Sequence, residues 1–308
     1  MKNIALGEMI ERAAMNFGFD SCGIIPISFM DSFQTNLQKR VEAVPSTVPF
    51  YNCTPAKEKF SWGESIVICT YNFGKYRYPR EQRGRYGKAF LLGPKKDKPY
   101  GYDIPGFEDW FESQGIRFHQ GDFGSLRHAA EKAGLGITRK NNFFYTASGS
   151  YVDLVGFVID QECELIHDNN IKPCSDRCDL CQKACKTHSL SASYTMNPFL
   201  CISFLTSFGK GNVPPELKEE MYEQWICGCD NCQDACPYNL KHDWDEGEIY
   251  SDLEEIAPLL VPEKVVAAMD DFLKEQVIPR LSDHLQPEDT EVLRKNARRA
   301  IRNAKGDS

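Results

Sequence analysis

The sequence predicts an α+β protein with three consecutive segments: a mixed-sheet domain over 1–165, a cysteine-rich domain over 166–240 and a short helical segment over 241–308. Three observations support this class. In the first segment, short apolar runs typical of buried strands alternate irregularly with helix patterns. The second segment contains nine of the chain's 13 cysteines. In the third segment, prolines separate short helix patterns, and the last pattern is rich in arginine and lysine.

Strand and helix candidates in the first segment follow from hydrophobic periodicity and from glycine signals. Two apolar runs, over 22–25 and 65–70, are predicted to be buried strands. Two more strand candidates, over 142–147 and 152–160, flank Ser148-Gly149-Ser150, which favours a hairpin between them. Helix patterns lie at 6–17, 107–115 and 124–134. Because a hairpin pairs antiparallel strands, we expect a mixed sheet rather than a regular doubly wound one.

The composition is that of a folded protein. Of the 308 residues, 42% are hydrophobic and 26% are charged, and the net charge is −8. No apolar run approaches the roughly 18 residues that a membrane-spanning helix needs. The N-terminal helix pattern lacks the long apolar centre of a signal peptide. We therefore expect a cytoplasmic protein without a membrane partner, in which thiols stay reduced and the cysteines need another explanation than disulfides.

Two dense cysteine clusters carry the strongest chemical signal in the chain. The first is Cys174-x3-Cys178-x2-Cys181-x3-Cys185, and the second is Cys229-x2-Cys232-x3-Cys236 followed by Pro237. A C-x2-C-x2-C-x3-C-P run binds a 4Fe–4S cluster, and in two-cluster ferredoxins the last cysteine of a run binds the other cluster. Together with Cys201, these residues supply eight thiolates. The sequence therefore predicts two 4Fe–4S clusters.

Simpler interpretations account less well for this spacing. Structural zinc also uses four cysteines, but usually as paired C-x2-C knuckles separated by about a dozen residues or more. Cysteines that only pack in a core have no reason to recur at these short, regular intervals. Packing is instead the expected role of the isolated cysteines Cys22, Cys53, Cys69 and Cys163. Cys227 is out of step with the second cluster and is expected to be a spare thiol.

Beyond the clusters, the chain resembles the epoxyqueuosine reductase family, whose members complete the queuosine base of tRNA with cobalamin and iron–sulfur clusters. The resemblance is most specific in the segment CISFLT, which begins at Cys201, and in the run from Gly228 to Asn239. It extends to Gly18-Phe19-Asp20, to the AGLG at 133–136 and to a HEAT-like C-terminal end. It therefore covers nearly the whole chain.

The resemblance implies a ligand set and an electron path. One cluster would be held by Cys178, Cys181 and Cys236, with Cys174 as the fourth ligand. The other would be held by Cys185, Cys201, Cys229 and Cys232. A corrinoid-reductase-like N-terminal domain would bind cobalamin without a cobalt-ligating histidine motif, next to a two-cluster ferredoxin-like domain. Electrons would pass from an external low-potential donor, of flavodoxin or ferredoxin type, through the clusters to the corrin.

The family uses an aspartate as proton donor, and Asp122 in GDFGSLRHAAEKAGLG is the best match. A carboxyl that donates a proton needs a raised pKa, which a closed cofactor pocket provides. The alternative role is a helix cap, because Asp122 comes just before a helix pattern. Lys140, Asn141 and Ser203 match corrin contacts of the family, although ordinary loop or helix-surface roles remain open for all three.

Four departures separate the chain from the family pattern. Ser175 stands where the family usually has its first cluster cysteine, so that Cys174 comes one residue early. Lys186 replaces the proline that usually follows the first run, and Arg139 replaces the glycine of the GKN motif. The interval from Asp122 to AGLG is shorter, as is the whole chain. We expect these changes to alter turns and to leave both clusters in place.

A basic stretch over 75–98 carries nine lysines and arginines, with Tyr76, Tyr78 and Tyr86 between them. Cations neutralise phosphates and tyrosines stack on bases, so the stretch is a candidate tRNA contact. Corrin contact and a solvated surface are the other interpretations.

For the whole chain, the sequence favours a reductase that acts on epoxyqueuosine in tRNA. A corrinoid reductase with another substrate, such as a dehalogenation substrate, remains open. So does a two-cluster electron carrier without corrin, although such a carrier would not need the first 165 residues.

Overall fold

The structure, a computed structural model, describes residues 3–50, 54–94, 101–281 and 284–306. Contacts between residues divide the chain into two compact units. Unit 1 comprises 1–72, 101–178 and 193–195, and unit 2 comprises 73–100, 179–192 and 196–308. The units interleave along the chain, whereas the three segments expected from composition are consecutive; those segment boundaries remain a prediction.

Unit 1 is built on a four-stranded sheet with the order β1-β2-β6-β3. Its strands are β1 (Ser21–Pro26), β2 (Ser65–Asn72), β3 (Phe118–Gln120) and β6 (Val152–Ile159). The expected α+β class is confirmed. One detail is corrected: all three pairs in this sheet are antiparallel, so the sheet is not mixed. A separate two-stranded ladder joins β4 (Ile137–Thr138) to β5 (Phe144–Tyr145).

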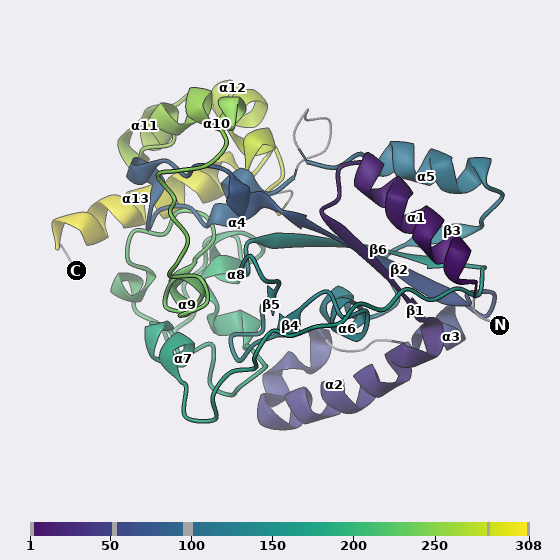
Figure 1. Cartoon of the computed structure of the whole chain (residues 1–308). Coiled ribbons are helices and arrows are strands. Elements are labelled where there is room, and N and C mark those ends of the chain that lie inside the picture. The colour runs from purple at the N-terminus through teal and green to yellow at the C-terminus, as the bar shows by residue number, and fades with distance from the viewer. Residues whose placement is uncertain (1–2, 51–53, 95–100, 282–283, 307–308) are drawn as a thin grey trace. The chain divides into compact units, whose positions relative to one another are not determined.

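Helices cover both faces of the four-stranded sheet (Figure 1). The helices of unit 1 are α1 (Ile4–Asn16), α2 (Asp31–Ala43), α3 (Ala56–Lys59), α5 (Ile104–Ser113) and α6 (Leu126–Lys132), with short helical turns at Ile27–Met30 and Pro45–Phe50. On one face, α1 and α5 pack against Val67 and Cys69 of β2. On the other face, α2, α3 and α6 pack against Ile66 and Ile68. Because side chains alternate along a strand, coverage of both faces explains why β2 is buried almost throughout.

The hairpin expected around Ser148-Gly149-Ser150 forms only as a turn. The N–H of Thr146 donates to the carbonyl of Gly149 at 3.0 Å, which closes the turn. The strands on either side do not pair with each other, because β6 already has β2 and β3 as neighbours. The segment before the turn therefore pairs β5 with β4 instead.

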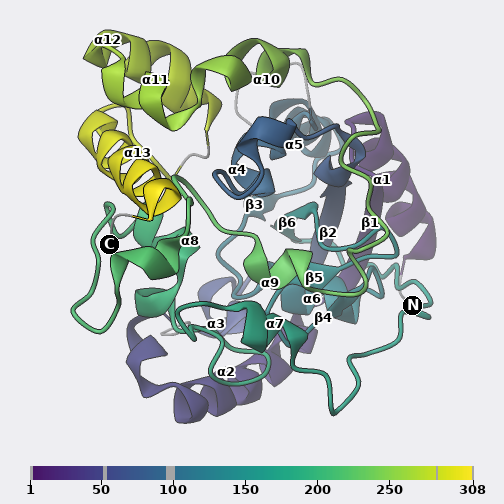
Figure 2. The ribbon, with the colours of Figure 1, turned by 90° about the vertical axis from the view of Figure 1, so that its left-hand side faces the viewer.

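Unit 2 consists of short helices and connecting segments. Its α-helices are α4 (Lys88–Leu92), α7 (Leu180–Ala184), α8 (Ile202–Thr206), α9 (Asn231–Asp234), α10 (Ser251–Ile256), α11 (Pro262–Ala267), α12 (Asp270–Phe272) and α13 (Thr290–Lys305). Tighter or wider helical turns lie at Phe73–Lys75, Arg80–Gln82, Pro198–Leu200, Glu219–Tyr222, Ala257–Leu259, Leu273–Val277 and Ile278–Arg280. Near the C-terminus, α13 packs along α11 (Figure 2). This arrangement agrees with the expected proline-separated helices.

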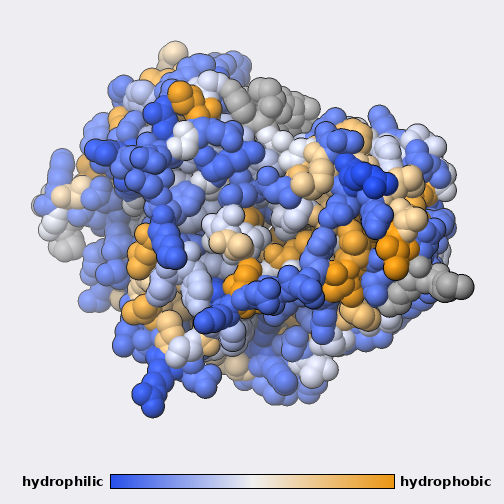
Figure 3. All heavy atoms as spheres, viewed as in Figure 1, coloured by the Kyte–Doolittle hydropathy of each residue, from blue (hydrophilic) through white to orange (hydrophobic). Residues whose placement is uncertain are grey.

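The surface in view is mainly hydrophilic, with apolar side chains in smaller groups (Figure 3). Single large apolar side chains such as Ile4 and Met269 are exposed. Within the described ranges, no helix combines the length and the apolar character that crossing a membrane requires.

Candidate iron–sulfur centre and active site

The four cysteines assigned to the second cluster all belong to unit 2 and lie at the ends of short helices. Cys185 ends α7, Cys201 precedes α8, and Cys229 and Cys232 flank the start of α9. Helices α7 and α9 pack together (Figure 2), which brings the two cysteine runs side by side. Thr206 of α8 also accepts a hydrogen bond from the N–H of Gly228 at 3.0 Å, next to Cys229. The fold therefore gathers cysteines that are far apart in sequence.

Electrostatic interaction among these thiols shows how close they are. Burial raises the pKa of Cys201, Cys229 and Cys232, and neighbouring thiolates add to the rise in each case. For Cys201, the backbone N–H groups of Phe204 and Ser203 work in the opposite direction. Buried thiols that are near one another lose their protons together only when cations compensate their charge. This donor set fits a thiolate-bound iron–sulfur cluster.

A single metal ion and a four-iron cluster differ in how their thiolate ligands are arranged. Across the described ranges of the chain, no three histidine, cysteine or acidic side chains converge as they do around one metal ion. A zinc ion draws its sulfur ligands to about 2.3 Å from one point, whereas a four-iron cluster binds its cysteines at separate irons.

The cysteines assigned to the first cluster are divided between the units, two in each. In unit 1, Cys174 and Cys178 lie in an irregular segment that the side chains of Arg139 and Lys140 hold. In unit 2, Cys181 and Cys236 are both 8% exposed. The first cluster's ligand set remains a prediction from spacing and resemblance.

Of the residues predicted to contact a corrin, Lys140 and Asn141 have other partners here. The ammonium of Lys140 donates to the carbonyls of Ser175, Asp176 and Cys178 at 2.9, 2.8 and 3.0 Å. The side-chain amide of Asn141 donates to the hydroxyl of Tyr145 at 2.8 Å. Ser203 is half-buried in α8, and its carbonyl accepts from the hydroxyl of Ser207 at 2.8 Å. The structure thus gives Lys140 and Asn141 anchoring roles.

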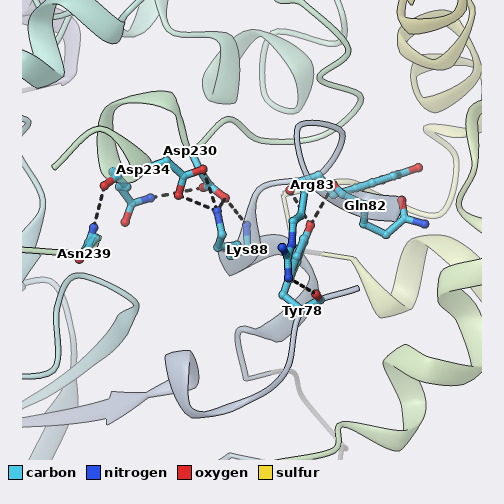
Figure 4. Close-up of polar contacts among 9 residues, drawn as sticks. Tyr78, Gln82, Arg83, Lys88, Asp230, Asp234 and Asn239 are labelled. Carbon is cyan, nitrogen blue, oxygen red and sulfur yellow. Dashed lines mark hydrogen bonds and ion pairs between the residues drawn. The ribbon is translucent and has the colours of Figure 1, made fainter. Parts of the chain in front are cut away.

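An ion-pair network next to the second cluster's cysteines was not expected from the sequence. The ammonium of Lys88 lies 3.2 Å from an oxygen of Asp230 and 2.7 Å from an oxygen of Asp234 (Figure 4). The backbone N–H of Lys88 donates to the same oxygen of Asp230 at 2.7 Å. Burial works to lower the pKa of Lys88, but the two carboxylates outweigh it and the pKa is raised. Lys88 therefore stays charged and holds the loop between Cys229 and Cys232.

Three arginines of the basic stretch also form ion pairs. Arg77 pairs with Glu254 at 2.7 Å, and Arg80 and Arg83 both pair with Asp245, at 2.6 and 2.8 Å. The three tyrosines of the stretch are buried: Tyr76, Tyr78 and Tyr86. Of the three interpretations of the stretch, stacking of these rings on bases is therefore not supported. Lys95, Lys96 and Lys98 lie outside the described residues.

Asp122 lies between β3 and α6, with its side chain 66% exposed. Its carboxylate is 3.2 Å from the ammonium of Lys59 and 3.7 Å from the ring of His119. The hydrogen bond and charge of Lys59 lower the pKa of this carboxyl, whereas a proton donor needs a raised pKa. The helix-cap alternative is wrong, because Ser125 caps α6 and accepts from the N–H of His128 at 3.2 Å.

A cavity of about 390 Å³ adjoins the Asp122 loop. Phe33 and Arg40 of α2, Phe144 of β5 and residues at the start of β6 line it. Gly124 forms part of the wall in a left-handed conformation with φ 112°. A Cβ atom there would lie 3.2 Å from the ring of Phe33, so only glycine fits comfortably. The cavity combines apolar walls with a few polar groups, as ligand sites do.

The isolated cysteines behave as expected where the structure describes them. Cys22 and Cys69 are fully buried on facing strands, and Cys163 is 2% exposed. Their packing role is confirmed, while Cys53 lies outside the described residues. Cys227 is also fully buried, and its carbonyl accepts from the N–H of Gly87 at 2.8 Å.

Comparison with known proteins supports this picture of the centre. The family model described as a 4Fe-4S double cluster binding domain matches residues 174–239, which include all eight predicted ligands. The chain therefore contains a binding domain for two 4Fe–4S clusters, as the cysteine spacing predicts.

Comparison over longer stretches points to one enzyme family. An epoxyqueuosine reductase from Cyclobacterium marinum is 28% identical over 261 residues, which cover 75% of this chain and 78% of that protein. The enzyme from Bacillus subtilis is 37% identical over 145 residues, covering 46% of this chain and 36% of that protein. A crystal structure of selenomethionine-labelled epoxyqueuosine reductase is 25% identical, covers 99% of this chain and 83% of its own, and has a TM-score of 0.76. A structure of epoxyqueuosine reductase with an epoxyqueuosine-modified stem loop of tRNA-Tyr is 26% identical, covers 98% and 82%, and also has a TM-score of 0.76. Fold, cysteine centre and sequence agree: over most of its length the chain is similar to epoxyqueuosine reductases.

Proposed function

We propose that the chain is a cobalamin- and iron–sulfur-dependent reductase that converts epoxyqueuosine to queuosine in tRNA. One observation carries the proposal: a double-cluster domain lies within a fold that matches, over 98% of the chain, an enzyme solved with an epoxyqueuosine-modified tRNA stem loop. The class of enzyme is an oxidoreductase. The tRNA substrate implies action in the cytoplasm and a tRNA partner.

For the clusters, we assign the ligands from spacing and, in unit 2, from proximity. The second cluster takes Cys185, Cys201, Cys229 and Cys232, whose thiols interact with one another. The first takes Cys174, Cys178, Cys181 and Cys236. An external donor of flavodoxin or ferredoxin type would supply the electrons, because the chain's own redox groups must be refilled after each turnover.

For the corrin, we assign the cavity beside the Asp122 loop as part of the binding site. When bound, the corrin supplies the electrons that reduce the substrate. Apolar walls from Phe33 and Phe144 exclude water, and the guanidinium of Arg40 offers a hydrogen-bond donor to polar groups of the ligand. Lys140, Asn141 and Ser203 remain proposed corrin contacts, and for Lys140 such a contact would compete with its three carbonyl partners.

For the proton, Asp122 remains the proposed donor. In the arrangement described here its carboxylate is exposed and paired with Lys59, which favours the ionised form. To donate a proton, the side chain must leave Lys59 for less polar surroundings, where desolvation raises a carboxyl pKa. Asp122 has a left-handed backbone, φ 62°, and lies close to Gly121 and Gly124, which both have positive φ. A loop with these glycines can reorient without steric conflict from side chains at those two positions.

The proposal is tested on protein purified anaerobically and loaded with iron and sulfide. Cobalamin binding is measured by its absorption after gel filtration, and conversion of epoxyqueuosine is measured by mass spectrometry on a modified tRNA anticodon stem loop. We expect stable corrin binding and conversion that depends on both cofactors. Asp122→Asn should bind corrin normally and lose most of the conversion.

The other functions give different results in the same experiment. An electron carrier would retain about eight irons but no cobalamin. A corrinoid reductase with another substrate would retain cobalamin and leave the stem loop unchanged. Either result would overturn the proposed function.

A further inference from the structure

Arg139 is a buried cation in direct contact with a cysteine of the iron–sulfur domain. The residue is 1% exposed and lies in the turn between β4 and β5. One guanidinium nitrogen donates to the sulfur of Cys174 at 3.7 Å, and the other donates to the carbonyl of Lys172 at 2.8 Å. All three residues belong to unit 1. The contact is therefore local to one compact unit.

The surroundings hold the guanidinium in place. Its central carbon lies 5.0 Å from the ring centroid of Tyr145, which is fully buried. The N–H of Arg139 donates to Phe143 at 3.0 Å, and its carbonyl accepts from Asn142 at 2.8 Å. A planar guanidinium fixed by a ring on one side and a carbonyl at one end has little freedom to turn away from the sulfur.

Lys140, the next residue, contacts the same cysteine segment in a different way from Arg139. Among the residues that the structure describes, Lys140 donates to backbone carbonyls of the cysteine segment, those of Ser175, Asp176 and Cys178. Its contacts fix the path of the chain. Arg139 also contacts the sulfur of Cys174, so its positive charge lies next to the iron–sulfur cluster that this cysteine would bind.

We propose that Arg139 is a positioning residue that raises the reduction potential of the cluster bound by Cys174. Reduction adds one negative charge to the cluster, and a buried cation with an N–H···S hydrogen bond stabilises the reduced form more than the oxidised form. Burial strengthens the effect, because little water screens the charge. The inference rests on the iron–sulfur part of the proposed function and needs neither the corrin nor the tRNA substrate.

The test compares reduction potentials in iron-loaded protein without corrin or tRNA. Wild type and Arg139→Met are titrated under anaerobic conditions, with the reduced clusters followed by electron paramagnetic resonance, and iron and sulfide are quantified on the same samples. We expect one of the two midpoints to become more negative in Arg139→Met and the other to stay unchanged. Arg117→Met, which removes an exposed arginine that lies over Trp62 in the same unit, should change neither midpoint.

A second variant keeps the test decisive if Arg139→Met loses iron. Arg139→Gln retains a hydrogen-bond donor without the charge and should hold its iron with a smaller negative shift. Unchanged midpoints in either iron-replete variant would overturn the inference. Loss of iron from both variants would also overturn it, because Arg139 would then anchor the cysteine segment rather than tune the cluster. Failure of epoxyqueuosine turnover with a shifted midpoint would refute only the proposed substrate.

Discussion

At the scale of single residues, Asp122 is the side chain whose surroundings differ most from its proposed task. Lys59 lowers the pKa of its carboxyl, and two thirds of the side chain is exposed. The same residue can serve as a proton donor only where that cation is absent. Its partner therefore controls its chemistry.

Replacement of Lys59 by methionine tests this control. Without the ammonium, the pKa of Asp122 should rise toward its usual range, so that the carboxyl takes up its proton at a higher pH than in wild type. The carboxyl titration is measured by 13C NMR on aspartate-labelled protein. If the proposed role is right, turnover of Lys59→Met should also persist to higher pH than that of wild type.

Lys57→Met is the matched control, because Lys57 pairs with Glu64 rather than with Asp122. The Asp122 titration should not move in that variant. An unchanged titration in Lys59→Met would contradict the account of the ion pair.

His128 gives a prediction for acid stability. Burial lowers its pKa and Lys132 lowers it further, while the carbonyl of Phe29 opposes both. The unfolded chain therefore binds more protons than the folded chain below about pH 6.5, so that stability is present above that pH and is lost as the pH falls. The thermal midpoint should drop between pH 7 and pH 5, and His128→Gln should drop less.

The exposed histidine His188 provides the comparison for this measurement. His188→Gln should follow the wild-type pH dependence. An equal drop in His128→Gln and wild type would show that other groups cause the acid sensitivity.

At the scale of elements, the second cluster's cysteines lie on short helices and loops. Hydrogen bonds and ion pairs with segments distant in the sequence fix the positions of these helices and loops. Asn296 of α13 donates to the carbonyl of Thr206 at 2.9 Å, and Thr206 accepts from Gly228 at 3.0 Å. Lys88 holds Asp230 from another part of unit 2. Segments distant in sequence thus determine where Cys201 and Cys229 lie.

Replacement of Lys88 tests the largest of these contacts. Asp230 is 3% exposed, and Lys88→Met leaves its carboxylate buried without the cation. Breaking a buried pair in this way costs about 3–5 kcal/mol. We expect a clearly lower thermal midpoint and partial loss of iron.

Arg302→Met is the control for Lys88→Met, because Arg302 pairs with Glu219 in an exposed setting where both side chains are nearly half exposed. Such pairs contribute about 1 kcal/mol or less. Equal effects of the two variants would argue against a structural role for the buried network.

The cysteines themselves give an assay of the cluster assignment. Cys201→Ser should lower the iron content to about half of the roughly eight atoms that two clusters contain, because one cluster loses a ligand. Cys227→Ser should keep the full iron content, since Cys227 is a buried thiol outside the predicted ligand set. Iron and sulfide are measured in anaerobic samples of both variants. Equal losses of iron in the two variants would contradict the assignment.

At the scale of the whole molecule, the cysteine spacing predicted the double-cluster domain, whereas the sequence did not predict which strands pair. The cysteine runs are local patterns set by the chain's own turns, so the double-cluster domain could be predicted directly. The α+β class followed from hydrophobic periodicity. Strand pairing did not, because β6 pairs with β2 from a distant part of the chain, which no local signal near the turn at 146–149 records.

Charge composition was also only partly informative. The acidic residues at 243–255 and the basic residues at 75–98 looked like separate surfaces in the sequence. In the structure Arg77, Arg80 and Arg83 pair with members of the acidic run. Tyr76, Tyr78 and Tyr86, which from the sequence were candidates for stacking on bases, are buried. Pairing between distant segments depends on the fold, so the sequence could not reveal it.

The central claim is the proposal that this chain reduces epoxyqueuosine in tRNA with two clusters and a corrin. The most direct test is mass spectrometry of an epoxyqueuosine-modified anticodon stem loop after anaerobic incubation with the iron-loaded, cobalamin-bound protein and a low-potential reductant. The account predicts conversion to queuosine that requires cobalamin and is largely lost in Asp122→Asn. A protein that carries both clusters and cobalamin but leaves epoxyqueuosine unreduced would contradict it.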